Sequence, residues 1–444
     1  MRQNKDYLIT EKPSRALLIF SIPMIIGNLF QQAYTIVDSA IVGRYVGETA
    51  LAAVGASYAL TSIFICIAIG GGIGASVIIS HHFGAHNYGR MKTCIRTALL
   101  SFLFISLILG GIGLIFSQQI MEVLNTPVDA IDIAVTYLNI YFLGLPFLFM
   151  YNILSSMFNA LGESRIPLYL LIFSSVLNIF LDLYMVAVLN LGVAGAAYAT
   201  FIAQGISAVL SLIIFVVTLQ QLQGKAEGWF SKTEFSDMSR IALPSILQQS
   251  TVSIGMMLVQ SVVNSFGTQI LAGFSAAMRI ESLCVVPMSA IGNAMSSYTA
   301  QNIGAEKEER ISQGYRAGNF MIIVIAVILC FFLEIAHKPL IALFLDNEPS
   351  AQTIVTGESY LKFIGFFFCM IGFKMAVDGI LRGAGAVRVF TIANLVNLTL
   401  RVTIAKFGAP IWGVSMVWYA VPLGWLANFL ISYGYYRTEK WKEA

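Results

Sequence analysis

Long stretches without a single charged residue constrain the fold of this chain more than any other feature. One of them, Leu51–Ser80, exceeds the roughly 20 apolar residues that an α-helix needs to cross a bilayer. Overall, 57% of the residues are hydrophobic and 11% are charged, whereas a soluble domain carries about 25% charged residues. The chain is therefore expected to be an all-α integral membrane protein. Further uncharged runs include Thr97–Gln118, Tyr137–Gly162, Leu183–Gly224, Ile241–Met278, Ser282–Ala305 and Ile411–Tyr436.

The 444 residues leave room for about twelve transmembrane helices with short connections. The first apolar run, starting near Ala16, is too long for a cleavable signal peptide, so we expect a retained first helix. The predicted spans are 16–43, 51–80, 94–118, 134–160, 166–189, 192–219, 241–265, 269–300, 317–336, 357–381, 389–407 and 411–434.

The positions of lysine and arginine predict the orientation of these spans. Nineteen of the 26 basic residues fall on the side that holds both termini, and only Arg44, Lys338 and Lys406 fall on the opposite side. Loops rich in Lys and Arg remain in the cytoplasm. We expect a multi-pass protein of the plasma (cytoplasmic) membrane with both termini cytoplasmic.

The two halves of the sequence repeat each other at a nearly constant offset of about 220 residues, which is the signature of a parallel repeat. Each half is expected to form a six-helix bundle of the same topology. The matching pairs are Gly84-Ala85 and Gly304-Ala305, Arg90 and Arg310, Arg96 and Arg316, and, with one residue of slippage, Pro23 and Pro244.

This repeat divides the chain into two lobes joined by a polar linker. The expected parts are a cytoplasmic N-terminal segment 1–15, an N-lobe 16–219 with helices 1–6, a cytoplasmic interlobe linker 220–240, a C-lobe 241–434 with helices 7–12, and a cytoplasmic C-terminal tail 435–444.

Two acids lie inside apolar helices of the first half, where an uncompensated charge is costly and marks a functional pathway. Asp38 lies late in the first helix, and Asn178 precedes Asp182 by one turn in the fifth, so the latter two share a helix face. Thr200 and Tyr137 are expected at a similar depth. Two carboxylates desolvated together cannot both stay ionised cheaply, so this oxygen-rich group would take a proton or a hard cation such as Na⁺. The alternative is that Asp38 simply faces the outer interface.

Other residues in the predicted helices suggest a hinge and a second polar cluster. Pro23 removes a backbone hydrogen bond in the first helix and predicts a kink or hinge there. In the second half, Glu281 lies near Arg279, while Lys374 and Asp378 stand one turn apart. They are possible second-lobe functional residues, or else simple ion pairs.

Several function classes find no support in the sequence. There is no phosphate-binding G-x-x-x-x-G-K-[ST] loop and no catalytic dyad, so we expect neither an enzyme nor a bound cofactor. The five cysteines show no metal-binding spacing, and a net charge of +3 gives no reason to expect nucleic acid. Energy for transport would then come from an ion gradient or a separate subunit.

The order of several short motifs resembles the multidrug and toxic compound extrusion (MATE) family, and the likeness extends from about residue 15 to 435. The motifs are Pro23, Gln31-Gln32, Asp38-Ser39, Val42-Gly43-Arg44, Leu51-Ala52-Ala53-Val54-Gly55, Gly84-Ala85 with Arg90, Asn159-Ala160-Leu161-Gly162, Gly304-Ala305 and Leu381-Arg382-Gly383-Ala384-Gly385.

The resemblance implies two pseudo-symmetric six-helix bundles in a V around a central cavity, and exchange of drug-like cations for Na⁺ or H⁺. In the DinF-like branch, the family's first-lobe coupling residues match Asp38, Tyr137, Asn178, Asp182 and Thr200. A Na⁺ ion would be held at Asp38, Asn178, Asp182 and Thr200. The predicted helix 241–265 departs from other branches, because it has no acid where they carry one.

These expectations describe a secondary active antiporter that exports amphipathic organic cations in exchange for H⁺ or Na⁺. Its partners would be small-molecule cationic substrates and the lipid bilayer, and we expect a monomer. One alternative is a lipid-linked precursor flippase of a related transporter superfamily, which needs a strongly cationic cavity. Another is the membrane subunit of an ATP-driven complex or an intramembrane enzyme.

Overall fold

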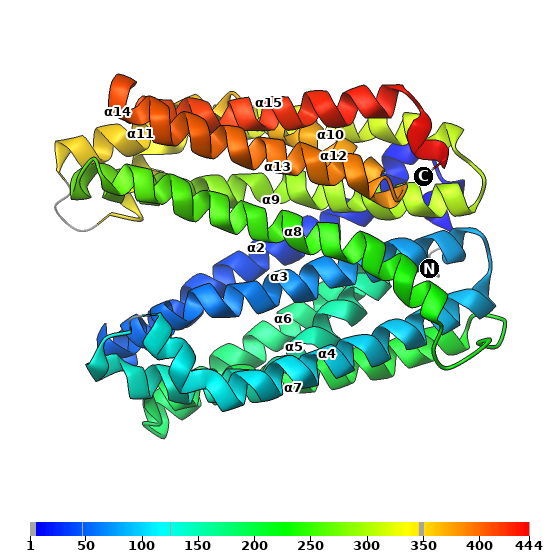
Figure 1. Ribbon diagram of the computed structural model, residues 1–444, viewed down its shortest axis with the longest axis horizontal. Coiled ribbons are helices and arrows are strands. Elements are labelled where there is room, and N and C mark those ends of the chain that lie inside the picture. The colour runs from blue at the N-terminus through cyan, green and yellow to red at the C-terminus, as the bar shows by residue number, and fades with distance from the viewer. Residues whose placement is uncertain (1–5, 47, 125, 346–349, 444) are drawn as a thin grey trace. The chain divides into compact units, whose positions relative to one another are not determined.

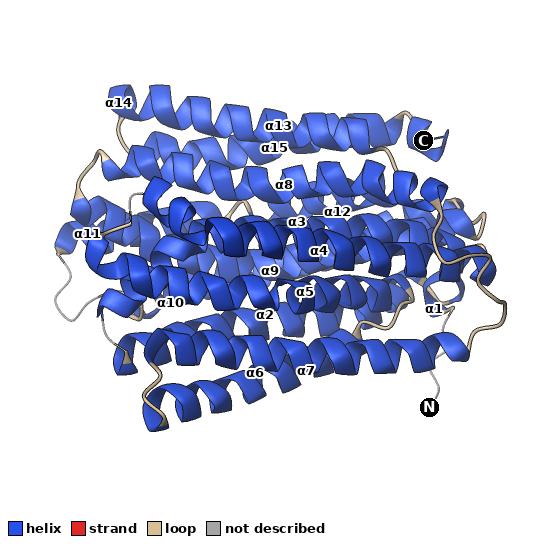
Figure 2. Ribbon diagram, turned by 60° about the horizontal axis from the view of Figure 1, so that its bottom comes forward, coloured by secondary structure: helices blue, strands red, loops and turns tan. Residues whose placement is uncertain are grey.

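The computed structural model describes residues 6–46, 48–124, 126–345 and 350–443. Every regular element in these ranges is a helix and none is a strand (Figure 2). This confirms the all-α prediction for the described part of the chain. Of the predicted terminal segments, residues 1–5 and 444 lie outside the described ranges.

The helices of the first half follow the predicted spans closely. They are α1 (Tyr7–Thr10), α2 (Pro13–Tyr45), α3 (Glu48–Gly84), α4 (Tyr88–Val123), α5 (Val128–Ala160), α6 (Arg165–Asp182) with the π-helical extension η1 (Leu183–Val188), and α7 (Gly192–Gln220) (Figure 1).

The second half has the same sequence of long helices. They are α8 (Lys232–Asn264), α9 (Thr268–Gly304), α10 (Glu309–Ala342), α11 (Ala351–Gly365), α12 (Phe368–Gly383), α13 (Val387–Thr403) with the π-helical extension η2 (Ile404–Gly408), α14 (Ala409–Trp412), α15 (Ser415–Arg437) and the 3₁₀ turn η3 (Lys440–Glu443).

Among the described residues, eleven helices are long and apolar enough to cross a membrane. The pair α11 and α12 passes the same test together but is bent by 53°, and counting it as one broken span gives twelve. The predicted helix 357–381 is therefore not straight.

Hydropathy also placed some helix starts too late: α8 begins at Lys232 rather than 241, because helical hydrogen bonding continues past the apolar segment into polar surroundings. The predicted linker 220–240 is non-helical only as far as Ser231.

The chain divides into two compact units, and each division lies two residues after an in-helix proline. The N-unit comprises Ile26–Ile246, and the C-unit comprises Met1–Ile25 with Leu247–Ala444. The divisions follow Pro23 of α2 and Pro244 of α8, both of which lie inside continuous helices. The same breakpoint thus recurs in each half of the sequence.

Helix partners repeat from one unit to the other. In the N-unit, α5 packs against α3, α4 and α7, while α6 packs against α7. In the C-unit, α12 packs against α9, α10 and α15, while α13 packs against α15. This correspondence supports the internal repeat predicted from the sequence.

Small residues allow close helix packing in both units, as expected in lipid, where apolar surface alone does not drive helix association. A side chain at Gly379 of α12 would collide with the backbone oxygen of Gly292 on α9. A side chain at Gly74 of α3 would meet the backbone of α8 at Met238. Any larger residue at either glycine must push two helices apart.

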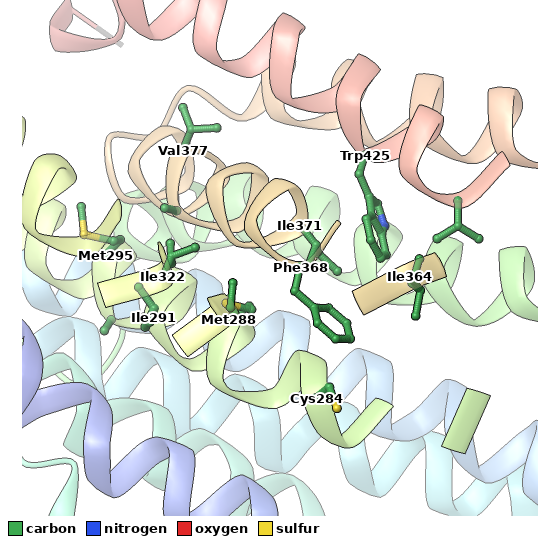
Figure 3. Packing of buried hydrophobic residues seen from close by; sticks show 14 of the residues in the cluster. Cys284, Met288, Ile291, Met295, Ile322, Ile364, Phe368, Ile371, Val377 and Trp425 are labelled. Carbon is green, nitrogen blue, oxygen red and sulfur yellow. The ribbon is translucent and has the colours of Figure 1, made fainter. Parts of the chain in front are cut away.

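The C-unit core shows how helical spacing selects its contact residues (Figure 3). Cys284, Met288, Ile291 and Met295 recur every three or four residues and therefore share one face of α9. They belong to the same buried cluster as Phe368 of α12. The hydrophobic cluster holds α9 in place, and with it the polar residues that α9 carries.

Arg90 and Arg310, which correspond to each other in the repeat, have the same role. Each binds residues at or just before the start of a helix that contains a proline. In the N-unit, Arg90 lies 3.1 Å from the buried carboxylate of Glu234 on α8, and His82 Nε2 lies 3.0 Å from the same carboxylate. Lys92 Nζ also donates to the backbone oxygens of Leu222 and Gly224 at 2.8 Å. The sequence identified this arginine as part of a repeat but gave no partner for it.

In the C-unit, the corresponding arginine holds the N-terminal segment. Arg310 Nε donates to Asn302 Oδ1 at 2.9 Å, and its Nη2 donates to the backbone oxygens of Leu8 and Glu11. Asn302 Nδ2 donates to Leu8 O at 3.2 Å. The buried α1 therefore belongs to the folded C-unit, although it lies within the predicted N-terminal segment 1–15.

Candidate functional site

The N-unit brings together the acids that the sequence singled out. Asp38 comes from the second half of α2, and Asn178 and Asp182 come from one face of α6, since residues four apart in a helix lie one above the other. Asp182 is the last residue of α6 before the π-helical segment η1. Such wide turns are frequent at functional sites.

The side chain of Asn178 is the centre of the hydrogen-bond network. In the orientation that gives both the nitrogen and the oxygen of the amide hydrogen-bond partners, Nδ2 donates to Tyr34 Oη at 2.7 Å and to Asp182 Oδ2 at 2.7 Å. The amide oxygen accepts from the backbone N of Thr200 at 3.0 Å and from its Oγ1 at 3.3 Å. One amide thus ties together α2, α6 and α7.

The two acids are near neighbours. The carboxyl groups of Asp38 and Asp182 lie within hydrogen-bonding reach of each other. Asp182 is fully buried and Asp38 is partly buried. The Oδ1 atom of each is buried without a hydrogen-bond partner among the residues that the structure describes. Asp38 therefore lies beside Asp182 within the N-unit.

Two tyrosines complete the site, and the sequence analysis found only one of them. Tyr137 of α5 lies close enough to Asp38 and Asp182 for their charges to act on its hydroxyl. Tyr34 was missed, although it lies one turn before Asp38 and therefore on the same helix face. The spacing rule that paired Asn178 with Asp182 would also have found Tyr34.

This arrangement can hold one small cation. Two carboxylates at this distance repel each other unless a proton or a metal cation lies between them. The unpartnered Oδ1 atoms, the amide and the hydroxyls supply oxygen, which suits a hard cation. The described residues contain no group of three or more His, Cys, Asp or Glu with metal-binding geometry, so a metal ion here would depend on amide and hydroxyl ligands as well.

Comparison with known proteins reproduces the twofold repeat of the chain. The MatE family model matches the chain twice, over residues 23–184 and 244–406. The chain belongs to the MATE family. Each match starts at the proline of the first helix in its half, so the family model follows the internal repeat.

Named relatives of this MATE chain are transporters. It is 32% identical over 430 residues to the "Probable multidrug resistance protein YpnP" of Bacillus subtilis (strain 168), covering 96% of each chain. A more distant relative, 23% identical with 95% of this chain and 94% of the other covered, is the "FAD transporter" of Shewanella oneidensis. A solved multidrug resistance MATE transporter, in an outward-facing conformation, has a TM-score of 0.92 at 24% identity and covers 100% of both chains.

Family membership establishes the general class of this protein. It is a multi-pass membrane transporter of the multidrug efflux type and is not an enzyme. As a MATE protein it transports small molecules and needs no cofactor for that task.

The second-half polar residues lie in the C-unit and form two separate groups. Lys374 pairs with Asp378 at 2.9 Å, as the one-turn spacing predicts, and Ser432 Oγ donates to Asp378 Oδ1 at 2.8 Å. The expected pairing of Arg279 with Glu281 is wrong. Arg279 is exposed and Glu281 is buried, since residues two apart in a helix point about 200° apart. Glu281 instead accepts a hydrogen bond from Tyr360 at 2.6 Å.

Proposed function

We propose that this MATE protein is a secondary active antiporter, in which cation binding at Asp38 and Asp182 drives the export of amphipathic organic cations. The observation that carries the proposal is the contact between these two carboxyl groups, with Asn178 bonded to one of them. A pair of acids inside apolar helices needs a compensating cation in any state that keeps the acids together. The cation is therefore expected to select that state.

The coupling step follows from charge balance. With a cation bound, the repulsion between Asp38 and Asp182 disappears and α2, α6 and α7 can stay joined through Asn178. Without it, the two carboxylates favour separation, which shifts the equilibrium between outward-open and inward-open states. Pro23, in the same helix as Asp38, would be the hinge that lets α2 change shape.

A proton is the cation that this geometry supports best. Two carboxyl groups within hydrogen-bonding reach can share one proton directly. Na⁺ is the alternative, with oxygen ligands from Asp38, Asn178, Asp182 and Thr200. Separate pH and Na⁺ gradients across proteoliposomes would distinguish the two cations.

The proposed substrates are cations, because the site residues of the N-unit include two acidic side chains and no basic one. The multidrug resistance relatives support this class, whereas the distant relative named as an FAD transporter introduces an anionic alternative. Ethidium and an anionic dye such as fluorescein, tested side by side, would separate these classes. A preference for the anionic dye would favour the flippase-type alternative.

The proposed setting is the plasma membrane, with a monomeric protein and both termini cytoplasmic.

The decisive experiment compares three neutralised acids in the reconstituted full-length protein. Asp38→Asn and Asp182→Asn are each expected to reduce gradient-driven ethidium efflux at least tenfold, because each variant lacks one acid of the pair. Asp132→Asn, the same change at an exposed position of α5, is the matched control and should keep wild-type efflux. Wild-type efflux by Asp182→Asn at equal protein levels would show that coupling takes place elsewhere.

A further inference from the structure

His337 is a buried histidine of the C-unit that the proposed coupling mechanism does not use. It lies in the last two turns of α10, and 7% of its side chain is exposed. Arg310 holds α1 at the start of the same helix, so His337 lies toward the opposite end of the C-unit (Figure 2). Histidine is the side chain that ordinarily changes charge between about pH 5 and pH 8. A buried histidine beside an acid is therefore a candidate proton-binding site.

Hydrogen bonds fix the tautomer of His337. Its Nδ1 atom lies 3.1 Å from the backbone oxygen of Leu333 and 3.0 Å from that of Glu334, both in the preceding turn of α10. A carbonyl oxygen can only accept a hydrogen bond, so Nδ1 must carry a hydrogen and donate it. Nε2 is therefore the atom of the ring that gains or loses the proton.

Nε2 of His337 points toward an acid of the neighbouring helix. Glu358 Oε2 of α11 lies 3.9 Å away, too far for a hydrogen bond, and Nε2 is buried without a hydrogen-bond partner among the described residues. In neutral His337, the lone pair of Nε2 faces the carboxylate, and neither atom has a hydrogen to donate. Once Nε2 is protonated, the same two atoms attract each other, and a shift of about 1 Å would bring them to the usual distance of an ion pair.

The other charged groups around His337 are exposed or already have partners. The remaining charged residues of α11 and of the last three turns of α10 are exposed, namely Glu334, Lys338 and Lys362. The part of α9 that packs against α11 at this end, Thr268–Met278, is uncharged. On α12, Lys374 pairs with Asp378, and Arg382 bonds to side chains of α9. Within the described ranges, the facing acid of α11 is thus the partner available to Nε2.

We propose that Nε2 of His337 is a proton-binding site, and that proton uptake ties α11 to α10 through an ion pair with Glu358. The Glu358 side chain is 21% exposed, which gives protons from solution a route to the pair. Burial disfavours a charged imidazole, and the facing carboxylate offsets that cost. Since α11 is one arm of the span that bends by 53° between α11 and α12, the proton would fix one arm of a broken helix.

A double-mutant cycle of Tm isolates this ion pair from every other effect of pH. The pair exists only in the folded protein, so it stabilises the folded state at acidic pH, and this stabilisation is lost as Nε2 releases its proton. Wild type, His337→Gln, Glu358→Gln and the double variant are unfolded in detergent at about pH 5.5 and about pH 8. The non-additivity of the Tm changes should be about 1–3 °C larger at the acidic pH. Equal non-additivity at both pH values would overturn the proposal.

Glu334→Gln, the same change at an exposed acid of α10, is the matched control. Paired with His337→Gln, it should show no non-additivity that depends on pH. If the double variant does not fold, the single variants remain decisive, because each should lose about 1–3 °C more Tm at pH 5.5 than at pH 8. A Glu358→Gln protein with the wild-type pH response would contradict the ion pair. The test needs no transport, so its outcome is independent of the coupling role proposed for Asp38 and Asp182.

Discussion

At the scale of single residues, Asn178 connects the parts of the N-unit site. Its one amide bonds Tyr34, Asp182 and Thr200, which come from three different helices. Each buried hydrogen bond of this kind contributes about 1 kcal/mol, and more where one partner is charged. The position of Asp182 relative to α2 therefore depends on neutral groups as well as on the acids.

Tyr34→Phe tests this dependence, because it removes one hydroxyl and keeps the ring. Loss of about 1 kcal/mol at the cation-bound site corresponds to roughly a fivefold higher cation concentration for half-maximal efflux. The measurement is ethidium efflux from proteoliposomes over a range of external pH and Na⁺. Tyr198→Phe, at an exposed position of α7, is the control. Equal midpoints for the two variants would exclude Tyr34 from the site.

At the scale of helices, the start of α8 is attached by side chains to α3 and α4, and the segment before α2 is attached to the start of α10. The carboxylate of Glu234 is 3% exposed and serves both Arg90 and His82. Arg310 binds backbone oxygens near α1 instead. The repeat keeps the arginine but changes its acceptor from a carboxylate to the backbone.

Glu234→Gln is expected to destabilise the N-unit, since Arg90 and His82 lose a buried charged partner. Half of Arg90 faces the solvent, so we expect a cost of about 1–3 kcal/mol, between the values for exposed and for buried ion pairs. Thermal unfolding in detergent should show a fall in Tm of a few degrees, ~2–6 °C. Asp237→Asn, an exposed acid one turn further along α8, should leave Tm unchanged. Equal Tm values for both variants would contradict a structural role for the contacts of Glu234 with Arg90 and His82.

At the scale of the whole molecule, the two halves share the same helix arrangement. Helix partners repeat from one unit to the other, and the family model matches the chain twice. Parallel repeats require each half to cross the membrane an even number of times. We therefore propose that the lobes 16–219 and 241–434 have the same orientation. Both termini and the linker would then lie in the cytoplasm.

Cysteine labelling in intact cells tests this topology in a background without the five native cysteines. Lys225→Cys in the linker and Lys442→Cys near the C-terminus should be protected from a membrane-impermeant maleimide until the cells are opened. Asn190→Cys, in the exposed turn between η1 and α7, should react at once. Labelling of Lys225→Cys and Lys442→Cys from opposite sides would mean an odd number of spans in the second half.

The sequence by itself determined most of the fold and predicted the acidic part of the candidate site. Only helices and closed barrels can span a bilayer, and charged side chains are costly inside it, so long uncharged runs reveal the helical spans directly. Burying the carboxylates of Asp38 and Asp182 in apolar helices is costly, so both stand out in the sequence as candidate functional residues. Asn178 and Asp182, like Lys374 and Asp378, are one turn apart, and helix geometry alone puts each pair on one face.

Only the tertiary structure decided which side chains from different helices meet. The bonds of Tyr34 with Asn178, of Tyr360 with Glu281 and of His82 with Glu234 join residues far apart in the chain. Periodicity reports which residues share a face but not which neighbouring helix that face contacts. That choice comes from close packing of entire helices, as at Gly292 and Gly379, where the absence of a side chain sets the distance between α9 and α12.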